Sequence, residues 1–292
     1  MSLLITGATG HLGRLVVEQL LAADVPAGDI VATGRSTDKI KDLADRGVQV
    51  RAVDFGDPGA VRAALAGADR VLLVSAMEPA ARVGQHGNVI DAARQAGVSL
   101  VAYTSIVNAG TASIRLAEDH QATERLLRDS GVPHVLLRNG WYHENYTDRL
   151  PAFLAQGAIP GSAGQGLISA AGRADYAAAA VRVLTTDGHD GQAYELGGDE
   201  PFTLAELAAE ISAQSGREVR YVDLPEAEYA EALKAHGVPA LMADMVAETD
   251  AAAARGALHT ASGHLAALTG RPAVTLSAAV SAALSALDRG VD

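Results

Sequence analysis

The segment Thr6-Gly7-Ala8-Thr9-Gly10-His11-Leu12-Gly13 follows a short apolar run and precedes a stretch of helical periodicity. Gly7 allows a sharp turn, Gly10 lets the backbone approach a pyrophosphate, and Gly13 lets the helix pack close to the strand. Free N–H groups at the start of such a helix bind phosphates. We therefore interpret residues 7–13 as a dinucleotide-binding turn. The alternative is a glycine-rich turn that serves packing alone.

The residues on either side of this turn alternate between short β-branched runs and longer helical stretches, as far as residue 140. We predict strands over 3–6, 29–33, 48–53, 70–75, 99–104 and 134–138. We predict helices over 12–23, 37–46, 58–65, 83–96 and 114–129, with Gly47, Gly67, Gly97 and Gly131 as left-handed ends of the last four. This strict alternation predicts a doubly wound Rossmann-type α/β fold with a parallel sheet.

The alternation ends after Gly140. We expect helices over 146–156 and 173–184, a strand over 192–197, and a loop with at most a short strand over 156–169. Thr203 and Glu206 have the spacing of a capping box at the start of another helix. The expected organisation is a nucleotide-binding domain over 1–145, with a smaller C-terminal α/β region over 146–292 that packs on it and completes a substrate cleft.

Composition excludes several classes of function. The 292 residues include 49% apolar and 20% charged side chains and carry a net charge of −12, which argues against nucleic-acid binding and a polybasic membrane surface. The absence of Cys excludes disulfides and thiolate chemistry, and no His-Glu-x-x-His motif indicates a metal site. The first residues show no basic region and no apolar run of signal-peptide length, so we expect a cytoplasmic protein. The run 272–287 is too short and polar to span a bilayer.

Residues at the ends of the predicted strands suggest how a cofactor binds. Arg35 follows the second strand, where a planar cation matches the 2′-phosphate of NADPH, although it also suits a plain surface position. Asp54 follows the third strand and suits either the adenine amino group or the cap of the next helix. The tips of the fourth and fifth strands carry small residues that suit the nicotinamide ribose: Ser75, Ala76, Met77 and Thr104.

The usual proton donor of short-chain dehydrogenases is missing. None of the seven Tyr residues has a Lys four positions later, and the chain has no Lys between residues 42 and 233. In those enzymes the Lys lowers the pKa of the Tyr that protonates the substrate oxygen. A conventional alcohol dehydrogenation or an epimerisation is therefore disfavoured.

The end of the sixth strand gathers the rare aromatic residues. Only 4% of the chain is aromatic, yet Trp141, Tyr142 and Tyr146 fall within six positions. Flat rings can pack against a planar substrate, and amide, imidazole or phenol groups can stabilise an oxygen that gains charge. We therefore predict that Asn139, Gly140, Trp141 and Tyr142 line the cofactor site. The candidate catalytic donors are His143, Asn145 and Tyr146; the competing interpretation is that the rings fill a core.

Several segments together resemble the NmrA-like, atypical short-chain dehydrogenase family, including bacterial NADPH:quinone oxidoreductases and the related triphenylmethane reductases. They are the glycine turn, 85–88, 102–105, the aromatic segment 136–146 and the Arg-Ala-Asp-Tyr segment that begins at Arg173. The resemblance implies NADPH as cofactor, Arg173 in the site, and flavin-free hydride transfer to a quinone or similar planar acceptor. Many relatives have a Lys where this chain has His120.

Two other functions fit the sequence less well. A non-catalytic NADP(H)-sensing regulator of the NmrA type could use the acidic stretch 223–250, which holds seven acids and one Lys, as a partner surface. An isomerase would lack its Tyr and Lys pair. The Ala-rich helices also allow a homodimer.

Overall fold

Seven parallel strands form the central sheet of the computed structural model, which describes residues 1–76, 78–112 and 114–289. These seven are β1 (Leu3–Ile5), β2 (Ile30–Gly34), β3 (Gln49–Ala52), β4 (Arg70–Leu73), β5 (Leu100–Ile106), β6 (His134–Asn139) and β8 (Ala193–Leu196); two further strands are β7 (Ala158–Gly161) and β9 (Arg220–Asp223). Their order in the sheet is β3-β2-β1-β4-β5-β6-β8, while β7 and β9 pair separately. The order reverses between β1 and β4, which places a crevice at their carboxyl ends.

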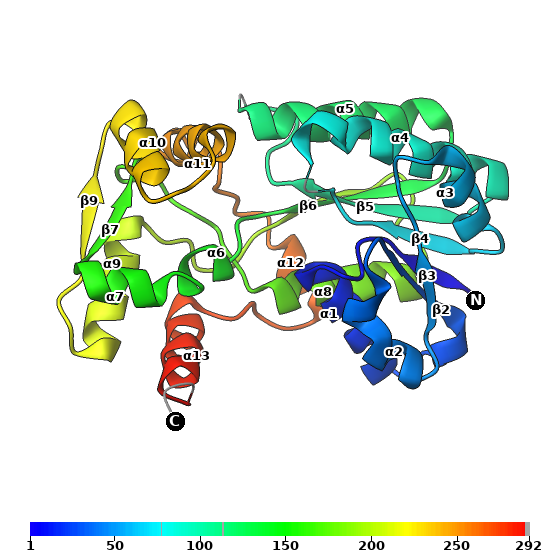
Figure 1. The fold of residues 1–292 in the computed structure, drawn as a ribbon, viewed down its shortest axis with the longest axis horizontal. Coiled ribbons are helices and arrows are strands. Elements are labelled where there is room, and N and C mark those ends of the chain that lie inside the picture. Colours follow the sequence, from blue (N-terminus) through cyan, green and yellow to red (C-terminus); the bar gives the residue numbers. More distant parts are fainter. Residues whose placement is uncertain (77, 113, 290–292) are drawn as a thin grey trace.

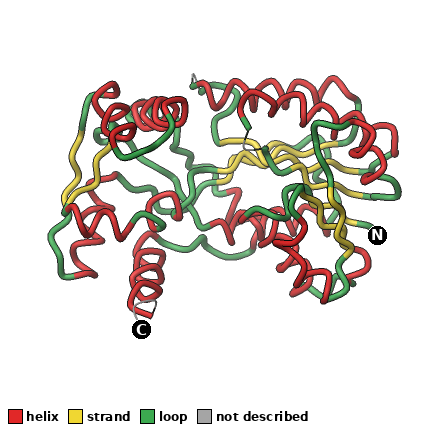
Figure 2. Tube along the Cα trace, viewed as in Figure 1, coloured by secondary structure: helices red, strands yellow, loops and turns green. Residues whose placement is uncertain are grey.

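Helices cover both faces of this sheet (Figures 1 and 2). They are α1 (His11–Ala22), α2 (Lys41–Asp45), α3 (Pro58–Leu65), α4 (Pro79–Ala96), α5 (Arg115–Ser130), α6 (Glu144–Thr147), α7 (Leu150–Gln156), α8 (Arg173–Thr185), α9 (Leu204–Ser215), α10 (Glu226–Ala235), α11 (Ala240–Ala253), α12 (His264–Thr269) and α13 (Leu276–Arg289), with 3-10 turns at Ala27–Asp29 and Thr37–Ile40. In Figure 1, α3, α4 and α5 lie above the sheet and α1, α2 and α8 lie below it. The Rossmann-type fold that the sequence predicts is thereby confirmed.

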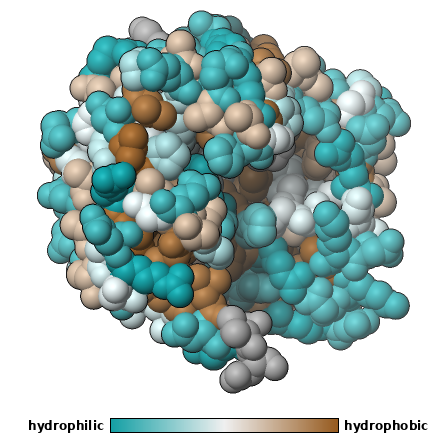
Figure 3. All heavy atoms as spheres, turned by 60° about the vertical axis from the view of Figure 1, so that its left-hand side comes forward, coloured by the Kyte–Doolittle hydropathy of each residue, from teal (hydrophilic) through white to brown (hydrophobic). Residues whose placement is uncertain are grey.

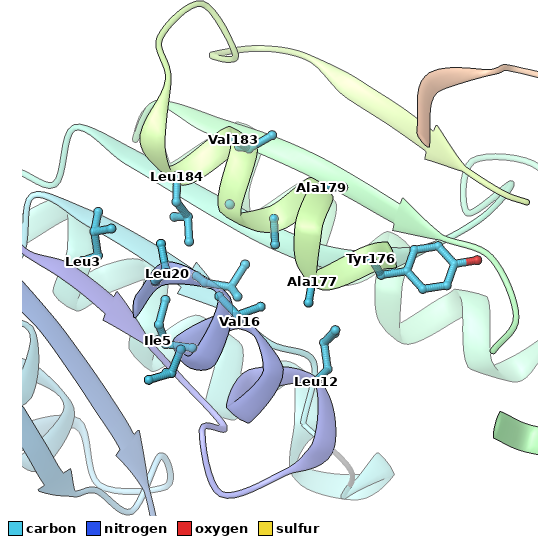
Figure 4. Packing of buried hydrophobic residues seen from close by; sticks show 14 of the residues in the cluster. Leu3, Ile5, Leu12, Val16, Leu20, Tyr176, Ala177, Ala179, Val183 and Leu184 are labelled. Atoms are coloured by element: carbon cyan, nitrogen blue, oxygen red, sulfur yellow. The ribbon is translucent and has the colours of Figure 1, made fainter. Parts of the chain in front are cut away.

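The core below the sheet is built from α1 and α8 packed against β1 (Figure 4). Leu12, Val16 and Leu20 recur on one face of α1 and are buried. The Ala residues of α8 let its axis approach α1 closely, and Ala177 and Ala180 are buried there. Burying each Leu contributes about 2 kcal/mol.

The residues beyond 145 do not form a separate unit. Helix α8 packs on α1, and β8 pairs with β6 as the seventh strand of the large sheet. The elements β7, β9, α7, α9, α10 and α11 form the smaller lobe at the left of Figure 1, whereas α12 packs on the cluster below the large sheet. Residues 173–196 therefore belong to the layers of the nucleotide-binding half, although they follow residue 145 in the chain.

The helix ends that the sequence predicts are confirmed. Gly47, Gly67, Gly97 and Gly131 all have positive φ angles, from 68° to 91°. The capping box at Thr203 is present, with Glu206 N donating to Thr203 Oγ1 at 3.2 Å. Residues 158–161 form the short strand allowed within the expected loop. Within the described residues, no helix has the length and apolar character needed to cross a membrane.

Candidate functional site

The glycine turn forms a tight cradle between β1 and α1. Gly7 adopts a φ of +61°, and Ala8 N donates to Thr33 O at 2.9 Å. A Cβ at Gly13 would lie 2.4 Å from Gly7 O, so only glycine allows α1 to start this close to the turn. Within the described chain no side chain caps this end of α1. The first N–H groups of the helix are therefore available to an anion.

The strand tips beside this cradle are joined by hydroxyl groups. Val74 N donates to Thr6 Oγ1 at 2.8 Å, and Ser75 N donates to Thr104 Oγ1 at 2.9 Å. These bonds fix the carboxyl ends of β1, β4 and β5 relative to one another. Ser75, Ala76 and Thr104 thus lie at the crevice, as the sequence predicts; Met77 lies outside the described residues.

Two residues of α4 hold the loop that follows β4. His86 Nε2 accepts from Ala76 N at 3.0 Å, and Arg82 Nε donates to Ala76 O at 2.7 Å. Burial, with the nearby His120 and Arg82 acting in the same direction, lowers the pKa of His86 to about 3, so its imidazole is neutral. Sequence reasoning missed this role. The spacing of four residues, which places Arg82 and His86 on one helix face, was the available signal.

A buried hydrogen bond lies behind the same loop. The Tyr103 hydroxyl is 2.7 Å from His120 Nδ1. Burial and the charge of Arg82 lower the pKa of His120 to about 3, while burial raises the pKa of Tyr103. The phenol therefore keeps its proton, and the imidazole of His120 is neutral.

Arg35 lies at the end of β2, where its side chain is 66% exposed and forms an ion pair with Glu78. Glu78 precedes α4, so a phosphate that binds Arg35 must compete with this carboxylate. Asp54 does not cap the next helix, because Asp57 caps α3 by accepting from Gly59 N at 2.8 Å. Asp54 instead accepts from Gly56 N within its own turn.

The end of β6 turns sharply at Gly140. A Cβ there would lie 2.6 Å from Ser169 O and 2.9 Å from the Tyr176 hydroxyl, which leaves no room for a side chain. Tyr176 donates to Trp141 O at 3.2 Å. Asn139 is buried and its Oδ1 has no partner among the described residues.

Tyr142 and Arg173 meet at the start of α8. The Arg173 guanidinium lies 5.4 Å from the centre of the Tyr142 ring, and that ring packs against Tyr176. Glu144 accepts from Arg173 N at 2.9 Å and thus binds the first turn of α8. The sequence did not single out Glu144, because its partner lies 29 positions further along the chain.

The three predicted donors have different surroundings. His143 is buried; its Nε2 donates to Ala170 O at 2.8 Å, and burial lowers its pKa. Tyr146 is buried against Phe202 in the smaller lobe, and burial with the nearby Asp250 raises its pKa well above the usual value. Asn145 is half-buried, and its side chain forms no hydrogen bond to the described residues.

The structure divides the aromatic residues between two hydrophobic clusters. Trp141 packs on the cluster of the smaller lobe, which also contains Tyr146, whereas Tyr142 packs on the cluster below the large sheet. Trp141 and Tyr142 remain half-buried, but Tyr146 is only 7% exposed. The aromatic segment therefore connects the two lobes. Within the described part of the chain, no group of three His, Asp or Glu residues suits a metal ion.

Comparison with known proteins places this geometry among nucleotide-dependent reductases. Residues 7–187 match the family described as NAD(P)H-binding. Quinone oxidoreductase 2 of Escherichia coli is 49% identical over 95% of this chain and 96% of its own length. The Escherichia coli NADPH-dependent quinone oxidoreductase complexed with NADPH has a TM-score of 0.94 at 48% identity, covering 97% of this chain and 99% of that chain.

A second relative reduces dyes. The triphenylmethane reductase of Citrobacter has a TM-score of 0.92 at 36% identity, covering 98% of this chain and 100% of that chain. The NAD(P)H azoreductase of Xenophilus azovorans is 32% identical over 94% of each chain. All four likenesses extend over both lobes.

Proposed function

Because the chain belongs to the NAD(P)H-binding family, we propose that it is an NADPH-dependent oxidoreductase that transfers hydride to a quinone. The likeness to the Escherichia coli quinone oxidoreductase, which spans almost the whole chain, carries this proposal. A purely regulatory role is not favoured. Quinones suit this chain because the charge that develops on reduction is delocalised onto an oxygen, so no Tyr and Lys pair is needed.

The residues present fit NADPH. The uncapped start of α1 and the cradle at Gly13 would hold the diphosphate, and residues 7–13 would line it. Arg35 would hold the 2′-phosphate, which would replace Glu78 as its ion-pair partner. Ser75, Ala76 and Thr104 would flank the nicotinamide ribose, with Asn139, Gly140 and Arg173 on the opposite side.

When bound, NADPH supplies the hydride. Trp141 and Tyr142 would border the planar acceptor, and the Asn145 amide is our candidate donor to the acceptor oxygen, since its side chain is not used within the described structure. His143 and Tyr146 would act as positioning residues. His143 holds the backbone at Ala170 by its hydrogen bond to Ala170 O, and Tyr146 anchors α6 in the hydrophobic cluster of the smaller lobe. Water supplies the final proton.

The proposal also covers the range of acceptors, the location of the protein and its oligomeric state. Triarylmethane and azo dyes are alternative planar acceptors, because relatives bearing those activities in their names share this fold. A cytoplasmic location suits a chain without Cys, which needs no oxidising compartment. A homodimer stays a prediction.

Stopped-flow absorbance of NADPH tests the function. Purified protein without added flavin is expected to consume NADPH only when a quinone is present. If none of several benzoquinones and naphthoquinones caused loss of the NADPH signal, the assignment would be wrong. The regulatory alternative would then be supported by a protein partner retained only with NADP(H).

Replacing Arg35 by Ala is expected to weaken NADPH binding by about tenfold or more while NADH binding changes little, because only NADPH carries the 2′-phosphate. Fluorescence titration of each nucleotide measures both affinities. Arg46→Ala is the matched control, since Arg46 is an exposed residue at the end of α2. Equal weakening of NADPH and NADH would contradict the 2′-phosphate assignment.

A further inference from the structure

A cavity of about 360 Å³ lies where the loop after β5 meets the end of α11. Asn108 and Thr111 form one wall, and Arg255, Gly256 and His259 form the other. Figure 3 shows the molecule hollowed between its two lobes, with brown and white surface in the depth and teal at the rim. Nothing in the proposed cofactor site uses these residues.

The two walls are held together before any ligand arrives. Asn108 has a φ of +57°, and its Nδ2 donates to His259 O at 2.8 Å and to Ala257 O at 3.1 Å. Asn is one of the few residues other than glycine that readily adopt this conformation. The cavity is therefore a built feature that joins the two lobes.

The charge of the cavity is positive. None of its lining residues is acidic, and Arg255 enters no ion pair with the described residues, its Nη1 donating to Ala251 O at 3.0 Å. Two acids lie close to the walls and are ion-paired: Glu195, whose Oε2 accepts from Asn108 N at 2.8 Å, pairs with Arg138, and Glu248 pairs with Arg115. In a chain with a net charge of −12, this leaves a local cation beside an imidazole.

The cavity also adjoins the predicted acceptor position. Asn108 follows β5 by two residues, at the same sheet edge as Thr104. His259 Nδ1 is 3.0 Å from Ser169 Oγ, and Ser169 O is the atom nearest to the Cβ position of Gly140. Trp141 packs on the hydrophobic cluster that contains Ala112 and Ala252 of the cavity lining, so a planar molecule on the Trp141 ring would have this cavity as a neighbour.

We propose that the cavity binds an anionic substituent, a sulfonate or carboxylate, on the planar acceptor, with Arg255 as the specificity-determining residue and His259 as a second donor. The inference rests on the proposed quinone reduction. The guanidinium offers a paired set of N–H groups that matches these planar or tetrahedral oxyanions. Acidic quinones would then be preferred over neutral quinones and over cationic triarylmethane dyes.

Equilibrium binding tests the inference without turnover. Trp141 is the only Trp in the chain, so quenching of its fluorescence measures acceptor binding. We expect a naphthoquinone sulfonate to bind about tenfold more tightly than the unsubstituted naphthoquinone, and added salt to reduce the difference. Arg255→Gln should abolish the difference, and Arg255→Lys should retain part of it, which a purely structural role of Arg255 would not predict.

Two comparisons complete the experiment. Arg62→Gln, a change at an exposed Arg of α3 outside the cavity, should leave the preference intact. In steady-state assays Arg255→Gln should raise KM for the sulfonate and leave the unsubstituted quinone unchanged. An unaltered preference in Arg255→Gln would overturn the inference alone, whereas failure of the wild-type protein to reduce either quinone would overturn the proposed function.

Discussion

Replacing Gly13 by Ala should weaken NADPH binding by about a hundredfold or more. The added Cβ would lie 2.4 Å from Gly7 O and 2.9 Å from Ala8 N, so α1 or the turn must move. Such a shift displaces the N–H groups that would bind the diphosphate, and losing two hydrogen bonds to a charged group at about 1.5–3 kcal/mol each weakens binding by about a hundredfold or more. Isothermal titration or nucleotide fluorescence measures the loss.

Gly84→Ala is the matched control for this change. Gly84 lies within α4, and a Cβ there would meet no atom within 4 Å. Alanine in a helix interior is favoured over glycine by about 0.5–1 kcal/mol, so Gly84→Ala should bind NADPH normally and unfold at slightly higher temperature. NADPH binding by Gly13→Ala at wild-type strength would show that the diphosphate does not lie on this turn.

Asp250→Asn should stabilise the protein by about 3 kcal/mol near neutral pH, with no gain at low pH. Asp250 is 5% exposed, and the only described hydrogen bond of its carboxyl group is from Ser162 N at 3.3 Å. Burial raises the pKa of Asp250 to about 6, although the Ser162 bond and the charge of Arg149 oppose this. Tyr146, Tyr221 and Tyr229 lie near it and offer no positive charge.

The stability of the folded chain falls as the pH rises because folding raises the pKa of Asp250. Between about pH 4 and pH 6 the folded chain keeps a proton on Asp250 that the unfolded chain has lost, so raising the pH through this window lowers stability. Asn removes this dependence and still accepts from Ser162. Denaturant unfolding of both proteins at several pH values measures the difference.

An exposed acid supplies the control for this experiment. Asp91→Asn, on the outer face of α4, should change stability little at any pH. Equal stability of Asp250→Asn and the wild-type protein at neutral pH would mean that Asp250 is stabilised as a carboxylate, and its burial would then carry no cost.

The prediction of the nucleotide-binding half succeeded because its signals are local. The residues 6–13 specify a strand, a turn and a helix start without help from the rest of the chain, and Gly13 does so through its missing Cβ. The same holds for Gly97 and Gly131, where glycine tolerates a left-handed conformation that ends a helix. The candidate positions Ser75, Ala76 and Thr104 followed from a general property of parallel sheets, namely that strand tips meet at one edge.

The features that the sequence left open all depend on contacts between distant segments. The pairing of β8 with β6 takes residues 193–196 into the large sheet, and no local pattern announces that partner. Whether a ring of the aromatic segment borders the crevice or fills a core was settled by packing: Tyr146 is buried with Phe202, a residue 56 positions later.

The sequence by itself determined the Rossmann-type sheet and the turn that suits a dinucleotide, since backbone conformation and hydrophobic period are properties of neighbouring residues. Only the tertiary structure decided the ionisation of His86, His120 and Asp250. Burial and charge compensation belong to a folded environment, where residues far apart in the chain remove water from one another.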